Sequence, residues 1–279
     1  MVQARIKTRA VCCICLSSLT SLKNRNSLHP SAVQSTIGEP FIEIATIEST
    51  NNYAMAQAQN HAATHGTAWF AHMQTNGRGQ RGKAWETEAG KNLILSILLD
   101  TSTFDLGRPF VLSTAVAVAT YQLFSEYAGD EASIKWPNDI YWRDRKAAGI
   151  LIDNLIRGNK WQWSVAGIGM NVNQSVFERL GIKAVSLKQI TGLSHDPVTL
   201  ARQLCAKVQT QYQLIASGKF AEVLDSYNAA LFQKHAAVRF KKDSRVFTAV
   251  VERVNEWNQL EISNGPQDYL EFGEVEWLL

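Results

Sequence analysis

The chain has 279 residues, 46% of them hydrophobic and 19% charged, which is enough for one sizeable core and a smaller second domain. No apolar stretch approaches the roughly 20 residues that cross a bilayer, so membrane spanning is excluded. The spacing of the cysteines indicates a reducing compartment, so a cytoplasmic protein is expected. The net charge is +3, but residues 1–38 contribute +5 and the remainder carries −2, which argues against a nucleic-acid partner.

Residues 1–38 are predicted to be a disordered extension. They contain a short apolar run and a Ser/Asn/Pro-rich tract, without the small-residue cleavage site of a signal peptide. Three of the four cysteines lie here, at Cys12, Cys13 and Cys15, in a spacing that fits neither a disulfide framework nor a zinc site. The fourth, Cys205, falls in a helical pattern and is expected in the core.

The first half of the folded part alternates strands and helices. Strands are expected at 41–47, 67–72 and 93–99, and helices at 53–63 and 108–127. Ser49 and Thr50 precede the first helix, where hydroxyl side chains are typical helix caps. The second helix is apolar on several faces and is expected to be buried.

Residues 74–85, QTNGRGQRGKAW, form a glycine-rich basic loop. Glycine permits close approach of the backbone and leaves N–H groups free to face an anion, so the loop is a candidate anion cradle. It is not a Walker A loop, because Lys83 is followed by Ala84, and it is not a dinucleotide motif, because a strand follows instead of a helix. The alternative is a mobile basic loop.

In the second half, the stretch 134–141 is predicted as a strand that Pro137 ends, because proline removes a ladder donor. A hairpin of strands at 146–156 and 161–168 follows and is predicted to form a pocket wall. Helical periodicity follows over 197–232. Short alternating strands at 236–240, 245–254, 259–263 and 269–279 indicate a small all-β module resembling an SH3 barrel.

Lys135 stands at the end of a predicted buried strand, beside Asn138 and Asp139. A buried cation is costly unless it meets an anion, so a ligand carboxylate or phosphate is indicated. A salt bridge to Asp139 or Asp153 is the structural alternative. No Ser-His-Asp or Cys-His pattern appears, and the polar set favours anion positioning over covalent catalysis.

Five blocks between residues 48 and 173 carry a resemblance. ESTN, QTNGRGQRGKAW, KWPNDIY, RKAAGILID and GIGMNVN, in this order, resemble the biotin protein ligase family. The resemblance implies an α+β fold: a mixed sheet with helices like that of class II aminoacyl-tRNA synthetases, plus a small C-terminal SH3-like barrel. The implied domains are the extension 1–38, a catalytic domain 39–233 and a C-terminal domain 234–279.

The family activity implied is the reaction of biotin with MgATP to biotinyl-5′-AMP, followed by transfer of biotin to a lysine of a biotin carboxyl carrier domain, of acetyl-CoA carboxylase or a related carboxylase. The alternatives are a lipoate or octanoyl ligase of the same fold and an RNA-binding RG segment, although a single RG block between strands is not typical of the latter. A monomer or weak homodimer is expected.

Site residues follow from the resemblance. Lys135 and Arg78 are expected to be catalytic, with Lys135 against the biotin carboxylate and α-phosphate and Arg78 on phosphate oxygens. The expected biotin-binding residues are Ser49, Thr50, Asn51, Gln74, Gly77 and Gly149. The expected ATP and adenylate residues are Arg78, Gly79, Gln80, Arg81, Lys83, Trp85, Asn138, Lys146 and Asn171, with Asp139 as a Mg²⁺ contact.

Two departures from the family pattern bear on function. Gln80 replaces a second loop arginine found in many relatives, and Lys83 stands where the last loop cation is often arginine. Because Gln80 cannot pair with phosphate as a charge, the chain is expected to lose biotinyl-AMP faster than its Gln80→Arg variant. Residues 1–38 also lack the periodicity of a winged-helix domain, so no sequence-specific DNA binding is expected.

Overall fold

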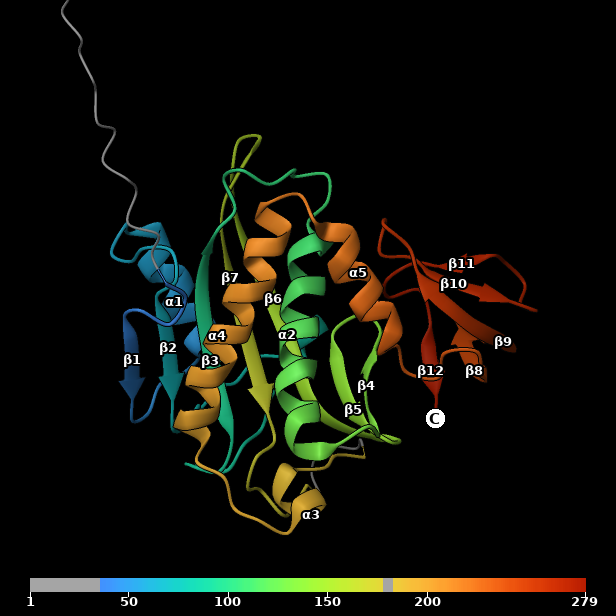
Figure 1. The fold of residues 1–279 in the computed structure, drawn as a ribbon, viewed down its shortest axis with the longest axis horizontal. Helices are drawn as coiled ribbons and strands as arrows, with labels where there is room; N and C mark the ends of the chain where they lie inside the picture. Colours follow the sequence, from blue (N-terminus) through green and yellow to red (C-terminus); the bar gives the residue numbers. More distant parts are fainter. Residues whose placement is uncertain (1–35, 178–182) are drawn as a thin grey trace, which may run out of the picture. The chain divides into compact units, whose positions relative to one another are not determined.

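The computed structural model describes residues 36–177 and 183–279, and most of the expected extension lies outside them. Seven strands form a mixed sheet in the order β1-β2-β3-β7-β6-β5-β4 (Figure 1). The β1–β2 pair is parallel, and the other neighbouring pairs are antiparallel. The strands are β1 Phe41–Ile44, β2 Ala68–Ala71, β3 Leu93–Asp100, β4 Ala132–Lys135, β5 Asp139–Trp142, β6 Arg145–Arg157 and β7 Lys160–Met170.

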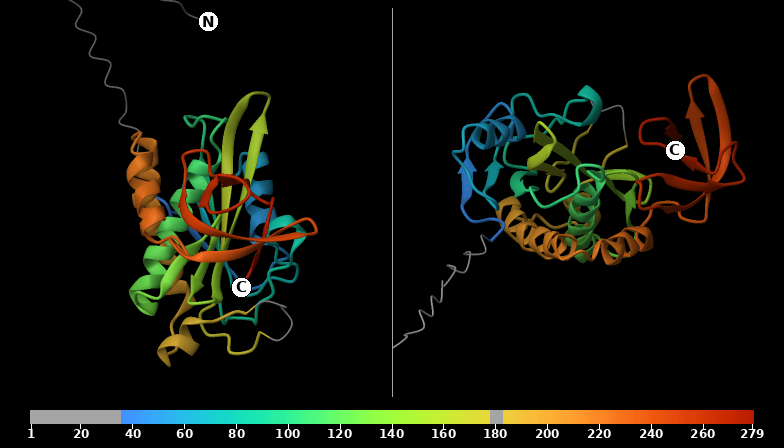
Figure 2. Two further views of the ribbon diagram at one scale, coloured as in Figure 1. Left: turned by 90° about the vertical axis from the view of Figure 1, so that its right-hand side faces the viewer. Right: turned by 90° about the horizontal axis from the view of Figure 1, so that it is seen from above.

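Helices cover both faces of this sheet. Three of them, α2 (Phe110–Ala128), α4 (Pro197–Ala216) and α5 (Phe220–Ala229), lie on one face, and α1 (Thr50–Gln59) lies on the other (Figures 1 and 2). Strand alternation explains the arrangement. The odd-numbered residues of β3 from 93 to 99 join the core beneath α2 and α4, and Leu98 joins a separate cluster beneath α1.

The helical segment predicted over 197–232 is two helices, not one. Asp196 caps α4, with its Oδ2 accepting from the N–H of Thr199 at 2.9 Å, and Pro197 occupies the first turn. The apolar stripe continues into α5, but Gly218 has a φ of +79° and ends the helical path. A short helix, α3 (Leu187–Thr191), precedes α4.

The strand predicted over 134–141 does break at Pro137, but the residues beyond the proline form a second strand, which was not predicted. Residues 136–138 form the turn of a tight hairpin between β4 and β5, because Pro137 has no N–H for a ladder. The register pairs Lys135 with Asp139 across this hairpin. By contrast, the predicted hairpin of β6 and β7 is confirmed over its whole length.

A second sheet follows in the chain, with strands β8 Ala237–Lys242, β9 Arg245–Val254, β10 Leu260–Ser263, β11 Tyr269–Leu270 and β12 Glu276–Leu278. Its order is β11-β10-β9-β8-β12. The single strand expected over 269–279 is two strands, since Gly273, with a φ of +85°, turns the chain between them. Figure 1 shows this C-terminal sheet beside α5 and the β4–β5 hairpin.

The packed body begins earlier than predicted. Ile37 is only 2% exposed and belongs to the main core, and its N–H donates to Oε1 of Gln209 at 2.7 Å. The expected boundary at residue 38 therefore falls inside the folded part. Cys205 is buried, as expected, and its burial raises the pKa of the thiol to about 12.

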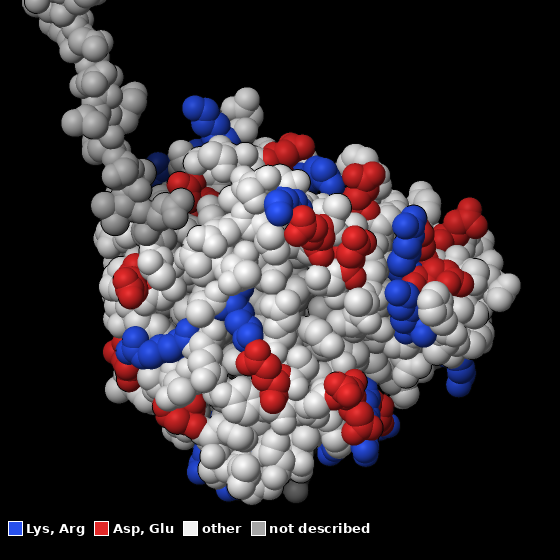
Figure 3. All heavy atoms as spheres, in the orientation of Figure 1, with Lys and Arg blue, Asp and Glu red and all other residues white. Residues whose placement is uncertain are grey.

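The described helices include none that is both long and apolar enough to cross a membrane. On the face that carries α2, α4 and α5, lysine and arginine side chains lie beside aspartate and glutamate (Figure 3). The pair Lys207–Glu126 is one example. Such interspersed charges give that face no extended potential of one sign.

Candidate active site

A cavity of about 1160 Å³ opens beside the N-terminus of α1. Its walls come from segments far apart in the sequence: the start of α1, the 74–85 loop, the β4–β5 turn, the middle of β6 and β7, and the last residues of the chain. Nearly all the residues expected at the site line it. The exception is Gly77, where an added Cβ would lie 2.3 Å from the Trp85 carbonyl oxygen, so this glycine serves the packing of the loop on itself.

Glycines form the floor of the cavity. Gly149 of β6 pairs with Gly169 of β7, and Gly167 pairs with Ser96 of β3. A Cβ on Gly167 would lie 2.0 Å from Asn51 Oδ1, and one on Gly169 would lie 2.3 Å from the Trp85 ring. The strands carry glycine here because side chains from α1 and the loop lie directly on their backbone.

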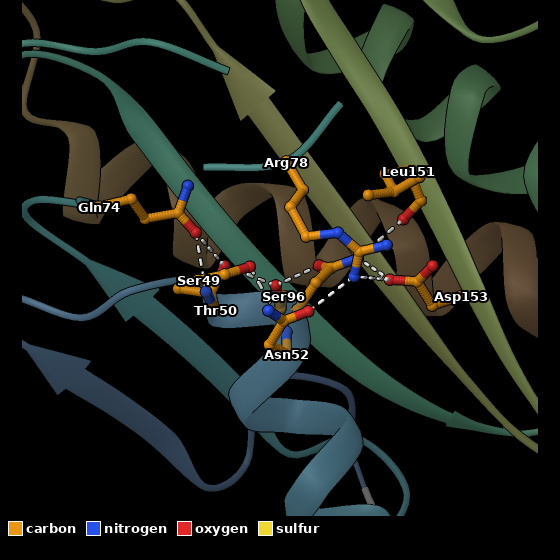
Figure 4. Close-up of polar contacts among 9 residues, drawn as sticks. Ser49, Thr50, Asn52, Gln74, Arg78, Ser96, Leu151 and Asp153 are labelled. Carbon is orange, nitrogen blue, oxygen red and sulfur yellow. Dashed lines mark hydrogen bonds and ion pairs between the residues drawn. The ribbon is translucent and has the colours of Figure 1, made fainter. Parts of the chain in front are cut away.

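A fixed polar cluster occupies one end of the cavity (Figure 4). Gln74 Oε1 accepts from the N–H and Oγ1 of Thr50, at 2.7 and 3.0 Å. Ser96 Oγ lies 2.7 Å from Thr50 Oγ1 and 2.6 Å from Asn51 Oδ1, and Ser49 caps α1. Because its oxygen is engaged, Gln74 has its amide Nε2 left as a donor, with no hydrogen-bond partner in the described part of the chain.

Arg78 lies across the mouth of this cluster. Its Nη1 donates to Asn52 Oδ1 at 2.6 Å and lies 3.4 Å from Asp153 Oδ2, as Figure 4 shows. Asn51 Nδ2 donates to the same Asp153 oxygen at 3.1 Å. Sequence reasoning missed the roles of Asn52 and Ser96 and offered Asp153 only as a partner of Lys135, since the motifs give no indication of which polar groups support them.

Part of the loop backbone that the glycines suggested as an anion cradle is bonded within the loop itself. Three N–H groups bond within the loop: Gly79 to the Lys83 carbonyl at 2.7 Å, Lys83 to Gln80 at 3.1 Å and Trp85 to Gly77 at 2.9 Å. A 3₁₀ turn, η1 (Gln80–Gly82), forms the tip. These three donors are used in folding the loop, and its cationic side chains add to whatever the other N–H groups offer an anion.

Lys135 is a cation that has no carboxylate partner among the described residues. Its Nζ lies over the rings of Tyr141 and Trp277, 5.1 and 5.3 Å from their centroids. Neither predicted salt bridge forms: Asp139 pairs with Lys146 at 2.7 Å, and Asp153 with Arg78. Burial lowers the pKa of Lys135, although the nearby Asp139 opposes this. An incoming anion would favour the charged form of Lys135 and so oppose the effect of burial.

Trp85 seals the floor. Its ring lies on Gly149 and Gly169, the ammonium of Lys146 stands 5.8 Å from the ring centroid, and its buried Nε1 has no hydrogen-bond partner among residues 36–177 and 183–279. The indole covers strand backbone that water would otherwise reach.

Asn138 and Asn171 use their amide nitrogens in the framework. Asn138 Nδ2 donates to the Ile150 carbonyl, and Asn171 Nδ2 donates to the carbonyls of Val185 at 3.2 Å and Lys146 at 3.4 Å. Both line the cavity and are almost fully buried. They hold the strand ends that carry Lys135 and Lys146.

A Mg²⁺ site built by the protein does not fit the residues around Asp139. Oδ1 of this carboxylate is already held by Lys146, and the described chain contains no group of three possible metal ligands. Mg²⁺ prefers several oxygen ligands and keeps waters, so a lone lysine-bound carboxylate is a poor host.

The C-terminal sheet contributes to the cavity in a way that sequence reasoning missed. Phe272, Gly273 and Trp277 line it, and Arg81 Nη2 donates to the Gly273 carbonyl at 2.6 Å. Aromatic residues in the last strands were the only signal available, and they equally fit a hydrophobic core.

Residues 43–171 match the profile of the Biotin/lipoate A/B protein ligase family. These residues form a domain of that family. The motifs from ESTN to GIGMNVN lie within or directly beside it, and the resemblance inferred from them is confirmed.

Curated relatives of this biotin/lipoate ligase domain are moderately similar. The bifunctional ligase/repressor BirA of Bacillus subtilis is 31% identical over 180 residues, which are 63% of this chain and 55% of the relative. The biotin--[acetyl-CoA-carboxylase] ligase of Mycobacterium tuberculosis is 29% identical over 171 residues, 60% of this chain and 62% of the relative. The matches thus span little more than half the length of these relatives.

The fold extends the likeness beyond the biotin/lipoate ligase domain. The biotin protein ligase from Aquifex aeolicus in complex with biotin and ATP superposes with a TM-score of 0.71 at 23% identity, covering 85% of this chain and 97% of that one. The expected fold class, a mixed sheet with helices and a small C-terminal β module, is confirmed.

Proposed function

We propose that this protein is a biotin protein ligase, which forms biotinyl-5′-AMP from biotin and MgATP and transfers biotin to a lysine of a biotin carboxyl carrier domain. The folded part up to residue 233 would form the catalytic domain and 234–279 the C-terminal domain. The observation that carries the proposal is Lys135, a desolvated cation without a carboxylate partner in the described chain, in one cavity with the fixed Thr50–Gln74 cluster.

The first step joins two anions, and this is the difficulty that Lys135 would relieve. The biotin carboxylate attacks the α-phosphorus of ATP, a carboxylate–phosphorus bond forms, and pyrophosphate leaves. Charge builds on the α-phosphate oxygens as this happens. A fixed ammonium in a water-poor site stabilises that charge without reorganisation. Lys83 and Lys146, which also line the cavity, would add positive potential for the polyphosphate.

In the second step the lysine amine of the carrier attacks the acyl carbon, an amide bond forms and AMP leaves. Water competes for the same mixed anhydride, so the site must exclude it. Trp85 on the glycine floor and Arg78 across the mouth would form that barrier.

The polar cluster supports biotin over lipoate. The ureido ring of biotin carries N–H donors and a carbonyl acceptor, whereas the dithiolane ring of lipoate carries neither. A site with a fixed amide donor at Gln74 and hydroxyls at Ser49 and Thr50 would leave these groups unpaired around lipoate, which penalises binding.

Further elements of the proposal concern partners and surroundings. Mg²⁺ would enter as part of MgATP, held by phosphate and water. The carrier would belong to acetyl-CoA carboxylase or a related enzyme, as the name of the mycobacterial relative suggests. A monomer or weak homodimer without a nucleic-acid partner is expected, and ATP as substrate is consistent with a cytoplasmic enzyme.

The test is mass spectrometry of the native protein after incubation with MgATP and either biotin or lipoate, together with ATP–pyrophosphate exchange. We expect bound biotinyl-AMP and biotin-dependent exchange, with exchange at least tenfold slower on lipoate, the discrimination that ~1.4 kcal/mol of unpaired hydrogen bonding produces. Exchange supported equally by lipoate, or no adenylate with either acid, would contradict the proposal.

A further inference from the structure

The C-terminal sheet touches three parts of the cavity wall. Trp277 of β12 lies under the Lys135 ammonium. In the β4–β5 turn, Trp136 packs edge-on against Phe272 with ring centroids 6.4 Å apart, and its Nε1 donates to Asn258 at 3.1 Å. The third contact reaches the tip of the 74–85 loop, where Arg81 meets the turn between β11 and β12.

The Arg81 contact is geometrically demanding on both sides. Arg81 Nη2 donates to the Gly273 carbonyl at 2.6 Å, and the guanidinium lies 5.3 Å from the Phe272 ring centroid. Arg81 itself holds a φ of +56°, in the left-handed region that non-glycine residues disfavour. A Cβ on Gly273 would lie 1.6 Å from Arg81 Nη2, so the partner must be glycine for this approach.

We propose that Arg81 is a positioning residue that fastens the 74–85 loop to the β11–β12 turn, and that this contact keeps the loop closed over the acyl-adenylate. The inference rests on the proposed function and assigns Arg81 a role other than the phosphate contact expected from its motif. The guanidinium is committed to a carbonyl and an aromatic face of the other sheet.

The loop is also held at both of its ends, and at the first of them the N–H groups of Thr75 and Asn76 donate to the carbonyls of Ile47 and Glu48. Arg78 holds the first end to Asn52 and Asp153, and Trp85 holds the last end on the glycine floor. The tip between them is exposed, and among residues 36–177 and 183–279 it is Arg81 that hydrogen-bonds the tip to the C-terminal sheet. Among the described contacts of the tip, the Arg81–Gly273 hydrogen bond is therefore the one whose loss frees it.

The fastening also links the loop to Lys135. Phe272, which the guanidinium covers, packs on Trp136, the residue next to Lys135 in the chain. Closure of the loop and placement of the cation thus depend on the same β11–β12 turn.

The experiment follows release of preformed biotinyl-AMP from the full-length protein in a chase with unlabelled ligand. Arg81→Gln should release it on the order of tenfold faster, because a charge-assisted hydrogen bond and a cation–π contact are both lost. Arg81→Lys should fall between, since its ammonium can still reach the carbonyl. The matched control is Arg253→Gln, which removes an exposed arginine paired with Glu261 on the same sheet, and release should stay at the wild-type rate.

Gly273→Ala tests the same contact from the other side. It should also speed release, and the Arg81→Gln/Gly273→Ala double variant should release no faster than the faster single variant, because both changes break one contact. Additive effects would overturn the proposal. So would a raised KM for ATP in Arg81→Gln with wild-type release, the result expected of a phosphate ligand.

Hydrogen exchange of the ligand-free protein separates this inference from the proposed function. The amides of Gly79 and Lys83 bond within the loop, and they should exchange faster in Arg81→Gln than in the Arg253→Gln control. Equal protection would overturn the fastening. Failure of the wild-type protein to make biotinyl-AMP would instead overturn the proposed function and leave this exchange result to decide the structural role.

Discussion

At Lys135 the folded protein holds an ammonium group between two aromatic rings, with the nearest acidic side chain, Asp139, bound to another lysine. Folding strips water from this group and gives no carboxylate in return within the described chain. The free energy of unfolding is thereby reduced, and the site gains a cation that attracts anions, as is common where catalytic groups are buried.

Replacing Lys135 by methionine should therefore stabilise the fold and abolish adenylate formation. We expect the melting temperature at pH 7 to rise by about 2–4 °C, the shift that ~1 kcal/mol produces in a protein of this size. The pKa of Lys135 in the folded protein lies below its unfolded value of 10.5. At a pH between these two values the unfolded chain binds more protons than the folded protein, so the stability of the wild type rises with pH in this range.

The stabilising effect of Lys135→Met should accordingly shrink as the pH approaches 10.5. Thermal unfolding at pH 7 and pH 9.5, together with pyrophosphate exchange, checks both parts. A lower melting temperature for the variant at pH 7 would refute the stability argument, and near-normal exchange would refute the catalytic one.

Among the elements, the end of β3 is held by two side chains that reach it from elsewhere. His65, just before β2, accepts from the N–H of Asp100 with Nδ1 at 3.0 Å, and Tyr212 of α4 donates to the Asp100 carbonyl at 2.6 Å. The two rings pack with centroids 4.7 Å apart. Accepting this bond requires Nδ1 to be unprotonated, so the ring is neutral and carries its proton on Nε2.

This contact predicts acid sensitivity. Burial lowers the pKa of His65 below 6.5, although the Asp100 charge opposes the shift, so the unfolded state takes up a proton first as the pH falls. Stability is therefore complete above pH 6.5 and declines from there down to the folded pKa. His65→Gln keeps an acceptor that does not titrate. Between pH 7.5 and 5.0 its melting temperature should fall by about 2 °C less than that of the wild type, the difference that ~1 kcal/mol produces.

The control is His61→Asn, which removes an exposed histidine whose left-handed backbone asparagine tolerates. This variant should keep the wild-type acid sensitivity. A similar loss in His65→Gln and wild type would show that the neutral His65 contact does not govern the pH dependence.

The elements that could be predicted are those whose local pattern decides them. The continuous apolar run of β3 and the long hairpin of β6 and β7 were predicted from residue order alone. The break after α4 was not, because the apolar stripe continues past Gly218 and only its backbone angle ends the helix. The contribution of Phe272 and Gly273 to the cavity was not predictable either, because Gly273 meets Arg81 across 192 positions of sequence and no local pattern records that contact.

At the scale of the whole molecule, the C-terminal sheet is joined to the rest by both apolar and polar contacts. Phe232 packs against Tyr141 of β5 and Trp277 of β12, and Trp277 also packs against Phe240. This aromatic row buries the boundary between the expected domains 39–233 and 234–279. We infer that the two would not open freely, since a hydrophobic interface disfavours relative motion.

Asn228 of α5 makes a paired polar contact across this junction. Its Nδ2 donates to the Val254 carbonyl at 2.9 Å, and its Oδ1 accepts from the Val254 N–H at 2.7 Å, as a neighbouring strand would. Val254 is only 2% exposed, so water could not easily replace either bond. Removing the amide therefore leaves a buried donor and acceptor unpaired, at a cost of roughly 1–3 kcal/mol.

Asn228→Ala should lower the melting temperature by about 2–4 °C per kcal/mol lost and make the two sheets unfold less cooperatively. Because looser docking of the C-terminal sheet also weakens the Arg81–Gly273 contact, the variant should release biotinyl-AMP faster, as Arg81→Gln does. Unfolding followed by both circular dichroism and tryptophan fluorescence tests the first effect, and the ligand chase tests the second. The control is Asp225→Ala, which changes an exposed residue of the same helix and should leave unfolding and biotinyl-AMP release unaltered. If Asn228→Ala behaved like this control, the Asn228 amide would not be the link between the two sheets.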